Sequence, residues 1–228
     1  MKHSGKARKA AFKMLFITLA LVILLPVVGV LGALVGSAMI AVSAFIFLVW
    51  LAFALFTLYF FRDPNARVPG GPGLVVSPGH GKVDVVDTLN ETQFMNGDCQ
   101  RISMFLSVID VHVQNSPVSG RVTYLKETEG QFLNAMKTEC ATCNENVYIG
   151  FQSTDPQNEK IGIKLIAGVI ARRIVPFVQV GDELVRGDRM SLIQFGSRVD
   201  VYLPHSAKIK VKIGDRVVGG ETVLATFE

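Results

Sequence analysis

The pair Gly196-Ser197 lies between two strand-like runs near the end of the chain, in the stretch "QFGSRVDVYLP". A serine hydroxyl can act as a nucleophile, and a glycine leaves its backbone carbonyl open to approach. These residue types allow two interpretations: an ordinary turn between strands, or a peptide bond that the protein itself breaks. The pair alone does not decide between them.

His112, in "DVHVQNSPVSG", is the first histidine to consider for proton transfer. The ordinary pKa of histidine, near 6.5, suits acid and base work at neutral pH. A lone histidine in a strand is more often structural, so a catalytic role stays open on these grounds. Asp110 comes two positions earlier, which would place both side chains on one strand face. Its carboxylate could orient the imidazole or close a turn.

The cysteines are Cys99, Cys140 and Cys143, an odd number that favours a reducing compartment over a disulfide framework. Cys140 and Cys143 have the C-x-x-C spacing of redox and zinc sites, but a zinc site needs a second pair of ligands. The sequence offers no such pair. We therefore expect no metal site, and we favour an incidental cysteine pair over a redox one.

Short β-branched runs separated by glycine must position these residues. They include "KVDVV", "RISMFL", "VYIGFQ" and "RVDVYL", and this pattern is typical of an all-β domain. The stretch "RDPNARVPGGPG", residues 62 to 73, is rich in proline and glycine and predicts a linker. The β domain is therefore expected from 74 to 228.

Two internal repeats refine the expected fold. V-x-[VI]-G-D-x-[LV]-V-x-G begins at Val178 and again at Val211, and S-P-x-x-G-[KR]-V begins at Ser77 and again at Ser116. The G-D pair suits a sharp turn because glycine tolerates positive φ and aspartate bonds its neighbouring backbone. Such paired hairpins resemble the flattened β-barrel sandwich of biotinyl and lipoyl carrier domains. Those domains present a modifiable lysine, whereas Gly196-Ser197 lies between these repeats.

The segment before the linker is expected in a membrane. No charged residue occurs from Met14 to Phe61, and one spanning helix needs roughly 20 apolar residues. Residues 14 to 61 therefore predict two helices, with a turn near Gly32 to Ala38. Gly32 and Gly36 also have the small-xxx-small spacing of close helix packing, which is common by chance. The apolar run is too long for a cleaved signal peptide.

The basic tail, residues 1 to 13, accounts for the positive net charge of the chain, because no acidic residue occurs before Asp63. Its basic residues are Lys2, Lys6, Arg8, Lys9 and Lys13. By the positive-inside rule they place the N-terminus in the cytoplasm, and two crossings return the β domain to the same side of the cell membrane. Such a tail favours contact with anionic lipid, and nothing indicates nucleic acid.

Several separated stretches follow one another in a familiar order: "FFRDP", "SPVSGRV", "FLNA", "IAGVIARRIV", "FGSRVDVYLP" and "GETVLA". Together they closely resemble the phosphatidylserine decarboxylases, in particular the short bacterial and archaeal type. The resemblance runs from about Tyr59 to the C-terminus. It favours the second interpretation of the Gly-Ser pair.

The resemblance implies a proenzyme that cuts itself between Gly196 and Ser197. The products would be a β chain, 1 to 196, and an α chain, 197 to 228, that remain associated. Ser197 would become a covalent pyruvoyl group, the only cofactor expected. Through a Schiff base this group would convert phosphatidylserine in the membrane to phosphatidylethanolamine and CO2, in phospholipid biosynthesis. Whether copies of the chain form a homo-oligomer stays open.

The resemblance also assigns roles to side chains. His112 takes the place of the family's histidine and would act as general acid and base, with Asp110 as an orienting residue. Guanidinium groups bind phosphate and carboxylate, so Arg172, Arg173 and Arg198 are expected to bind the lipid headgroup. Adjacent Arg172 and Arg173 would point opposite ways on a strand, so one of the two would face the site.

Two departures from the family pattern limit these expectations. His80, in S-P-G-H-G, stands where the family has the aspartate of S-P-A-D-G, and Gln114-Asn115-Ser116 stands where N-R-A is usual. His80 is either a replacement base or the mark of a processing-deficient homologue that binds anionic lipid without catalysis. Decarboxylation of another amino acid is a further alternative.

Overall fold

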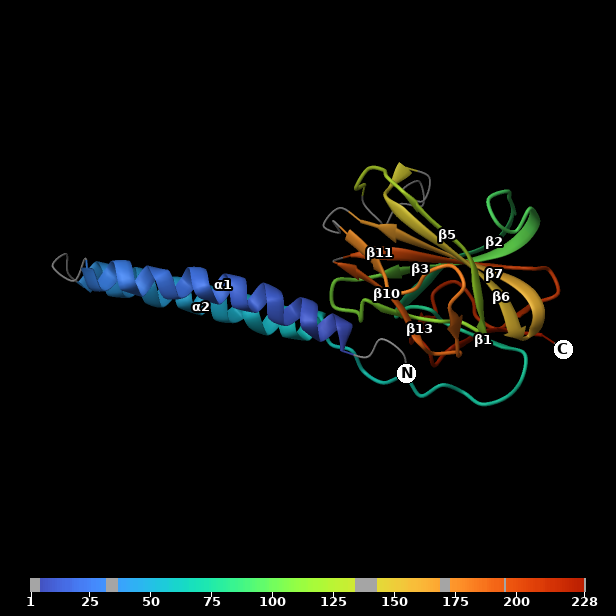
Figure 1. Ribbon diagram of the computed structural model, residues 1–228, viewed down its shortest axis with the longest axis horizontal. Coiled ribbons are helices and arrows are strands. Elements are labelled where there is room, and N and C mark those ends of the chain that lie inside the picture. The colour runs from blue at the N-terminus through green and yellow to red at the C-terminus, as the bar shows by residue number, and fades with distance from the viewer. Residues whose placement is uncertain (1–4, 32–36, 134–142, 169–172, 195, 228) are drawn as a thin grey trace. The chain divides into compact units, whose positions relative to one another are not determined.

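The computed structural model describes residues 5–31, 37–133, 143–168, 173–194 and 196–227. The chain divides into two compact units, a helical unit from Gly5 to Asp63 and a β unit that begins at Pro64 (Figure 1). Each unit is described by itself.

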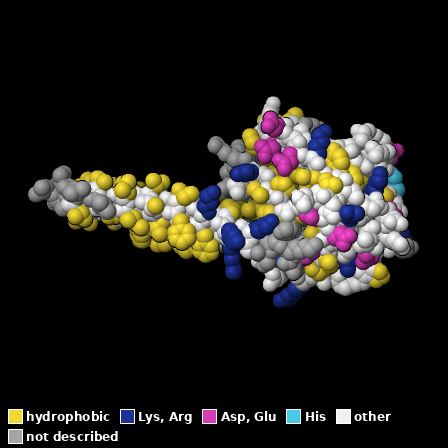
Figure 2. Space-filling model, in the orientation of Figure 1, with side chains coloured by type: hydrophobic (Ala, Val, Ile, Leu, Met, Phe, Trp, Pro, Cys, Tyr) yellow, Lys and Arg dark blue, Asp and Glu magenta, His cyan; other side chains and the backbone are white. Residues whose placement is uncertain are grey.

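Helices α1 (Lys6–Leu31) and α2 (Ser37–Phe60) pack against each other in the helical unit. The Trp50 indole on α2 donates a 3.0 Å hydrogen bond to the Thr18 hydroxyl on α1. Large apolar side chains such as Phe16 and Ile40 are exposed, and Figure 2 shows hydrophobic side chains over both helices. Both helices are long and apolar enough to cross a membrane. They suggest membrane association.

Helix α1 begins earlier than expected, because most of the basic tail is helical from Lys6 onward. Lysine, arginine and the interspersed alanines are good helix formers, so the tail continues the apolar helix. Helix α1 ends at Leu31 and helix α2 begins at Ser37, so the turn expected near Gly32 to Ala38 falls mostly on residues outside the described ones. Gly32 and Gly36 lie outside the described residues.

The β unit is mostly β, as expected, and the runs singled out in the sequence form strands. Its strands are β1 (Leu74–Val76), β2 (Gly81–Glu91), β3 (Gly97–Leu106), β4 (Val113–Asn115), β5 (Ser119–Thr128), β6 (Asn146–Asp155), β7 (Gln157–Ala167), β8 (Arg173–Pro176), β9 (Glu183–Leu184), β10 (Arg189–Gln194), β11 (Ser197–Leu203), β12 (Lys208–Ile209), β13 (Arg216–Val217) and β14 (Val223–Thr226).

These strands form one eight-stranded sheet, in the order β13-β2-β3-β11-β7-β6-β5-β9, and two three-stranded sheets, β1-β14-β12 and β4-β10-β8. The pairs are antiparallel throughout the described strands. None of the three sheets closes on itself over the residues that the structure describes, so the expected flattened barrel is not confirmed. The likeness to biotinyl and lipoyl domains stays an expectation.

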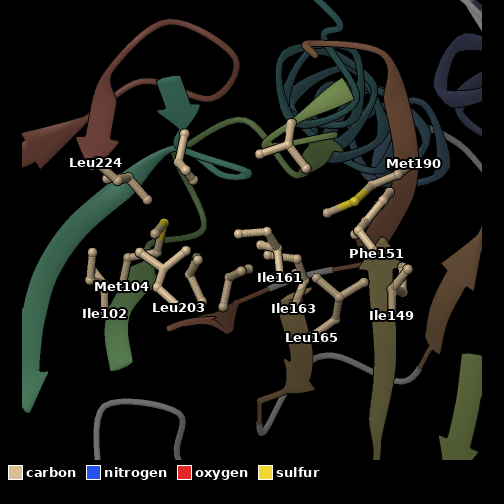
Figure 3. Close-up of a cluster of buried hydrophobic side chains, with 14 of the residues drawn as sticks. Ile102, Met104, Ile149, Phe151, Ile161, Ile163, Leu165, Met190, Leu203 and Leu224 are labelled. Carbon is tan, nitrogen blue, oxygen red and sulfur yellow. The ribbon is translucent and has the colours of Figure 1, made fainter. Parts of the chain in front are cut away.

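The hydrophobic core lies between the eight-stranded sheet and the two smaller ones. Figure 3 shows Met104, Phe151, Ile163 and Leu203 of the large sheet together with Met190 of β10 and Leu224 of β14. Alternate residues of each strand point into this core because side chains alternate between the two faces of a sheet.

The strands fall into two halves with the same order of elements. The inner half is continuous, from β4 to β10, and the outer half is split into β1–β3 and β11–β14. In the large sheet the outer half reads β13-β2-β3-β11 and the inner half β9-β5-β6-β7, so β11 and β7 meet in the middle. Of the two small sheets, β1-β14-β12 belongs to the outer half and corresponds strand by strand to β4-β10-β8 of the inner half. The inner half is therefore inserted between β3 and β11.

The sequence repeats mark equivalent turns of the two halves. Gly181 and Gly214 both have φ +101°, a conformation that glycine adopts without steric cost. Their amides donate 2.8 Å hydrogen bonds to the carbonyls of Val122 and Val83, respectively. The fold thus repeats one strand–turn unit, once in each half.

The two S-P motifs bond to each other where the halves meet. The Val76 amide donates to the Pro117 carbonyl at 2.9 Å, and the Asn115 amide donates to the Pro78 carbonyl at 2.8 Å. The chain crosses between the halves twice, after Leu106 and after Gln194. Gly196-Ser197 lies on the second crossing.

Candidate active site

Ser197 is the first residue of β11, immediately after the second crossing. It pairs with Leu106 of β3 on one side and with Ala167 of β7 on the other. Its side chain shares the strand face of Val199 and Val201, which belong to the core. The serine is therefore held at the inner surface of the large sheet, between two strands.

The Ser197 hydroxyl is fully buried, and no hydrogen-bond partner for its Oγ occurs among the residues that the structure describes. A buried polar group without a partner costs about 1–3 kcal/mol. A group of this kind in a native structure calls for an explanation, and a catalytic role is one such explanation. The observation fits a serine that is consumed by a reaction.

Gly196 has φ +42° and occupies the crossing itself. A β-carbon built on it would lie 3.7 Å from Cγ1 of Val108, so the first crossing passes close to the second. The Ile193 amide donates a 3.1 Å hydrogen bond to the His112 carbonyl. The loop from Ser107 to His112 therefore lies beside the chain that leads to Ser197.

His112 lies in this loop, directly before β4, and is fully buried. Its Nδ1 is 3.0 Å from the Asp110 backbone carbonyl, which can only accept a hydrogen bond. In the neutral imidazole this contact assigns the proton to Nδ1 and leaves Nε2 as the basic nitrogen. His112 is thus oriented as a base by the backbone.

The expectation that Asp110 and His112 share a strand face is wrong, because both precede β4 in an irregular loop. The Asp110 carboxylate instead accepts a 2.8 Å hydrogen bond from the Ser107 amide and so closes a turn. It also lies 3.4 Å from the Arg216 guanidinium. Asp110 orients His112 through its carbonyl and not through its carboxylate.

A buried amide next to His112 was not assigned a role from the sequence. The Gln114 side chain donates to the His112 carbonyl at 2.8 Å and accepts from the Ser191 hydroxyl at 2.8 Å. All three residues are fully buried. No local sequence pattern indicates this contact, because Gln114 and Ser191 are 77 residues apart in the chain.

His80 is half-buried just before β2 and packs against the C-terminal repeat. A β-carbon built on Gly219 would lie 2.9 Å from Cδ2 of His80 and 3.1 Å from the Asn115 Oδ1. His80 therefore lies at the meeting point of the S-P motifs, beside β4. The strand that follows His80, β2, pairs with β13 on one side and with β3 on the other, and β3 in turn pairs with β11.

Arg198 points away from Ser197, because successive residues of β11 face opposite sides of the sheet. It is buried, and it forms two hydrogen bonds to the Asp84 carboxylate at 2.8 and 2.5 Å. This pair engages the guanidinium on the other face of the sheet, and the role of Arg198 as a headgroup ligand stays a prediction. A buried arginine in an apolar strand predicts an acidic partner, and Asp84 in "KVDVV" was the nearest such signal.

Arg173 remains near the crossing. It is exposed at the start of β8 and pairs in register with Gln194, two residues before Gly196. Arg172 lies outside the described residues, as does Cys140 of the C-x-x-C pair. Arg173 is therefore the described arginine best placed to reach a ligand at this junction.

The far face of the large sheet carries buried polar groups as well. Burial raises the pKa of the Asp200 carboxyl, while a 2.5 Å hydrogen bond from the Ser103 hydroxyl acts in the opposite direction. Burial and the charge of Glu91 raise the pKa of the Cys99 thiol from 9.0 to about 11. These groups face away from Ser197 and are not part of its surroundings.

Two apolar helices joined to a β unit, with a buried serine and histidine at its crossing, indicate a membrane-associated protein of mostly β structure with a candidate active site. The phosphatidylserine decarboxylase profile matches residues 53–225. The chain is 42% identical to the phosphatidylserine decarboxylase proenzyme of Symbiobacterium thermophilum over 199 residues, 85% of this chain and 90% of that protein.

Two further proteins with the same name agree. The one from Desulfotalea psychrophila is 42% identical over 80% of this chain and 83% of its own length. The one from Nocardia farcinica is 45% identical over 74% of this chain and 71% of its own length. The chain belongs to the phosphatidylserine decarboxylase family.

Proposed function

We propose that this chain is a proenzyme that cuts itself between Gly196 and Ser197 and then decarboxylates phosphatidylserine to phosphatidylethanolamine and CO2. Membership of the family supports the reaction and its substrate. The observation that carries the proposal is the fully buried Ser197 hydroxyl without a hydrogen-bond partner in the described part of the chain. A serine that served only a turn would have no reason to leave its hydroxyl unsatisfied.

The cut begins when Ser197 Oγ attacks the Gly196 carbonyl carbon. The C–O bond of an ester forms, the amide C–N bond breaks, and the Ser197 nitrogen takes up a proton as an amine. Loss of the Ser197 α-proton then expels the Gly196 carboxylate and leaves dehydroalanine. Water converts this residue to pyruvoyl and releases ammonia, so all atoms are accounted for.

His112 is the base for these proton transfers. Its Nδ1 bond to the Asp110 carbonyl leaves Nε2 with the lone pair. The Gln114 amide and the Ile193 amide both hold the His112 backbone carbonyl. The backbone of His112 is therefore held by two amides and its ring by the bond at Nδ1, which favours proton transfer.

The expected pyruvoyl group fits the position of Ser197. Leu106 and Ala167 flank that position across β3 and β7 and would exclude water from it. Arg173 beside Gln194 would meet the phosphate or carboxylate of the headgroup. When formed, the group supplies a carbonyl that accepts electrons as CO2 leaves, the task of pyridoxal phosphate in other decarboxylases.

The substrate explains the helices, because a phospholipid does not leave the bilayer. A β unit tethered at the membrane meets its substrate at a raised effective concentration. By the positive-inside rule, the basic tail favours the cytoplasmic face of the cell membrane.

The experiment that tests this function is CO2 release from phosphatidylserine in mixed micelles. The wild-type chain is expected to release CO2, and Ser197→Ala is expected to lose all release. Ser206→Ala, at an exposed serine of the same α segment, is the matched control and is expected to retain it. Equal release by wild type and Ser197→Ala would contradict the proposal.

A second candidate function rests on His80, since the family has aspartate at that position. A histidine can relay a proton but does not supply a fixed negative charge. If the chain were a processing-deficient homologue that binds anionic lipid, His80→Asp would create both cleavage and CO2 release. We expect the wild-type chain to cleave already, with His80→Asp changing only the rate.

A further inference from the structure

The outer edge of the large sheet carries a cluster of exposed basic and apolar side chains on β2, on β13 and on the segments directly before and after β13. We call it the cationic edge, and it comprises Lys82, Lys210, Lys212, Ile213, Arg216 and Val218. Ile213 is 62% exposed and Val218 is 40% exposed. Large apolar side chains surrounded by basic ones are typical of surfaces that insert into the headgroup region of a bilayer.

Two of these basic residues face each other across the strands. Lys82 of β2 and Arg216 of β13 are partners in register, and like charges directly opposite destabilise a sheet. Arg216 is 3.4 Å from the Asp110 carboxylate, but its side chain is 71% exposed, so this contact is weak. A layer of negative charge outside the sheet would relieve the repulsion.

The inner half provides an internal comparison, because the same turn occurs there with different side chains. The equivalent register pair is Arg121 with Glu183, which have opposite charges. Val180 stands in the place of Ile213 and is 57% exposed, and Gln179 stands in the place of Lys212. The positive charge is therefore specific to one edge, although the fold and the exposed apolar tip are shared.

From these observations we infer that the cationic edge docks the β unit onto the surface of an anionic bilayer, with Ile213 in the headgroup region. Arg216 links this edge to the Asp110 turn of the loop that carries His112. Docking would therefore bring the loop beside Ser197 close to the lipid surface. The inference goes beyond the proposed function, since it concerns binding to bulk anionic lipid and does not depend on cleavage or decarboxylation.

The test uses the full chain in nanodiscs, with Trp50→Phe to remove the only native tryptophan. Ile213→Trp reports on the cationic edge, and Val180→Trp is the matched control at the equivalent exposed site of the inner half. With phosphatidylglycerol in brominated phosphatidylcholine, the tryptophan at 213 is expected to shift to the blue and to be quenched. The tryptophan at 180 is expected to show neither change.

Charge reversal and lipid composition complete the test. Each basic residue near a bilayer surface changes binding about fivefold, so Lys210→Glu with Lys212→Glu should abolish the quenching at 213, and raised salt should weaken it. The same quenching without anionic lipid, or equal quenching at 180, would overturn the inference. A response to phosphatidylserine alone would also overturn it, by indicating substrate recognition. Ser197→Ala should leave the result unchanged.

Discussion

At the residue scale, the buried positive charge of Arg198 is balanced by the carboxylate of Asp84. The Arg198 side chain is 1% exposed and is paired with Asp84, whose side chain is 32% exposed. Asp84→Asn leaves a buried charge without its partner, and we expect it to lower the free energy of unfolding by about 2–4 kcal/mol. Thermal unfolding in detergent measures this loss.

The control for Asp84 lies on the same strand, β2. Asp87 pairs with Arg101 at 2.6 Å, with side chains 41% and 21% exposed, respectively. Since exposed ion pairs contribute about 0–1 kcal/mol, Asp87→Asn should cost less than about 1 kcal/mol. Equal losses for the two variants would show that burial of Arg198 does not set the strength of its pair.

The Cys99 thiol should be unreactive toward alkylating reagents in the folded protein, because it is buried. A pKa raised from 9.0 to about 11 keeps the thiol protonated at pH 8, and the thiolate is the reactive form. Iodoacetamide at pH 8, followed by peptide mapping, should therefore modify exposed Cys143 and leave Cys99 unmodified until the protein unfolds. Because the pKa is raised in the folded state, the stability linked to Cys99 is complete below pH 9 and is lost as the pH rises through about 11. Rapid modification of Cys99 in the folded protein would contradict its burial.

At the element scale, the two G-D turns depend on glycine. Gly214 has φ +101° and nothing within 4 Å of a built β-carbon, so only its backbone conformation opposes a side chain. We expect Gly214→Ala to destabilise the β unit by about 1 kcal/mol. Gly97→Ala is the matched control, because Gly97 also has open space but no positive φ, and thermal unfolding should show no loss there. Equal unfolding temperatures would argue against strain at the turn.

The elements themselves were largely predictable from the sequence. β-branched runs predicted β2, β3, β6 and β11, and the V-x-[VI]-G-D repeat predicted two equivalent turns, because local patterns fix strands and turns. The loop position of Asp110 and His112 was not predictable, since "DVHVQ" has the alternation of a strand. The hydrogen bonds of Asp110 to Ser107 and to His112 bend the chain there.

At the scale of the whole molecule, the insertion of one half into the other explains why the proposed cut would fall at Gly196-Ser197. The chain returns from the inner to the outer half at Gly196-Ser197, and β10 and β11 belong to different sheets. Breaking this bond removes no strand from either sheet. Two side-chain contacts join segments that are far apart in the sequence: Arg198 with Asp84, and Gln114 with Ser191. Local sequence patterns therefore did not predict them.

The same arrangement should keep the two products together. β11 lies between β3 and β7 and pairs with both along its length, so the α segment contributes a central strand to the large sheet. We expect residues 197–228 to elute with residues 1–196 in detergent and to separate from them only in denaturant. Separation of the two chains under native conditions would contradict this prediction.

The central claim is that the Gly196–Ser197 bond breaks and that Ser197 becomes a pyruvoyl group. Intact-mass analysis of the purified protein tests it most directly. The account predicts two chains, residues 1–196 and residues 197–228 with pyruvoyl in place of serine, and a single uncut chain for Ser197→Ala. One uncut chain in the wild-type protein would contradict the account.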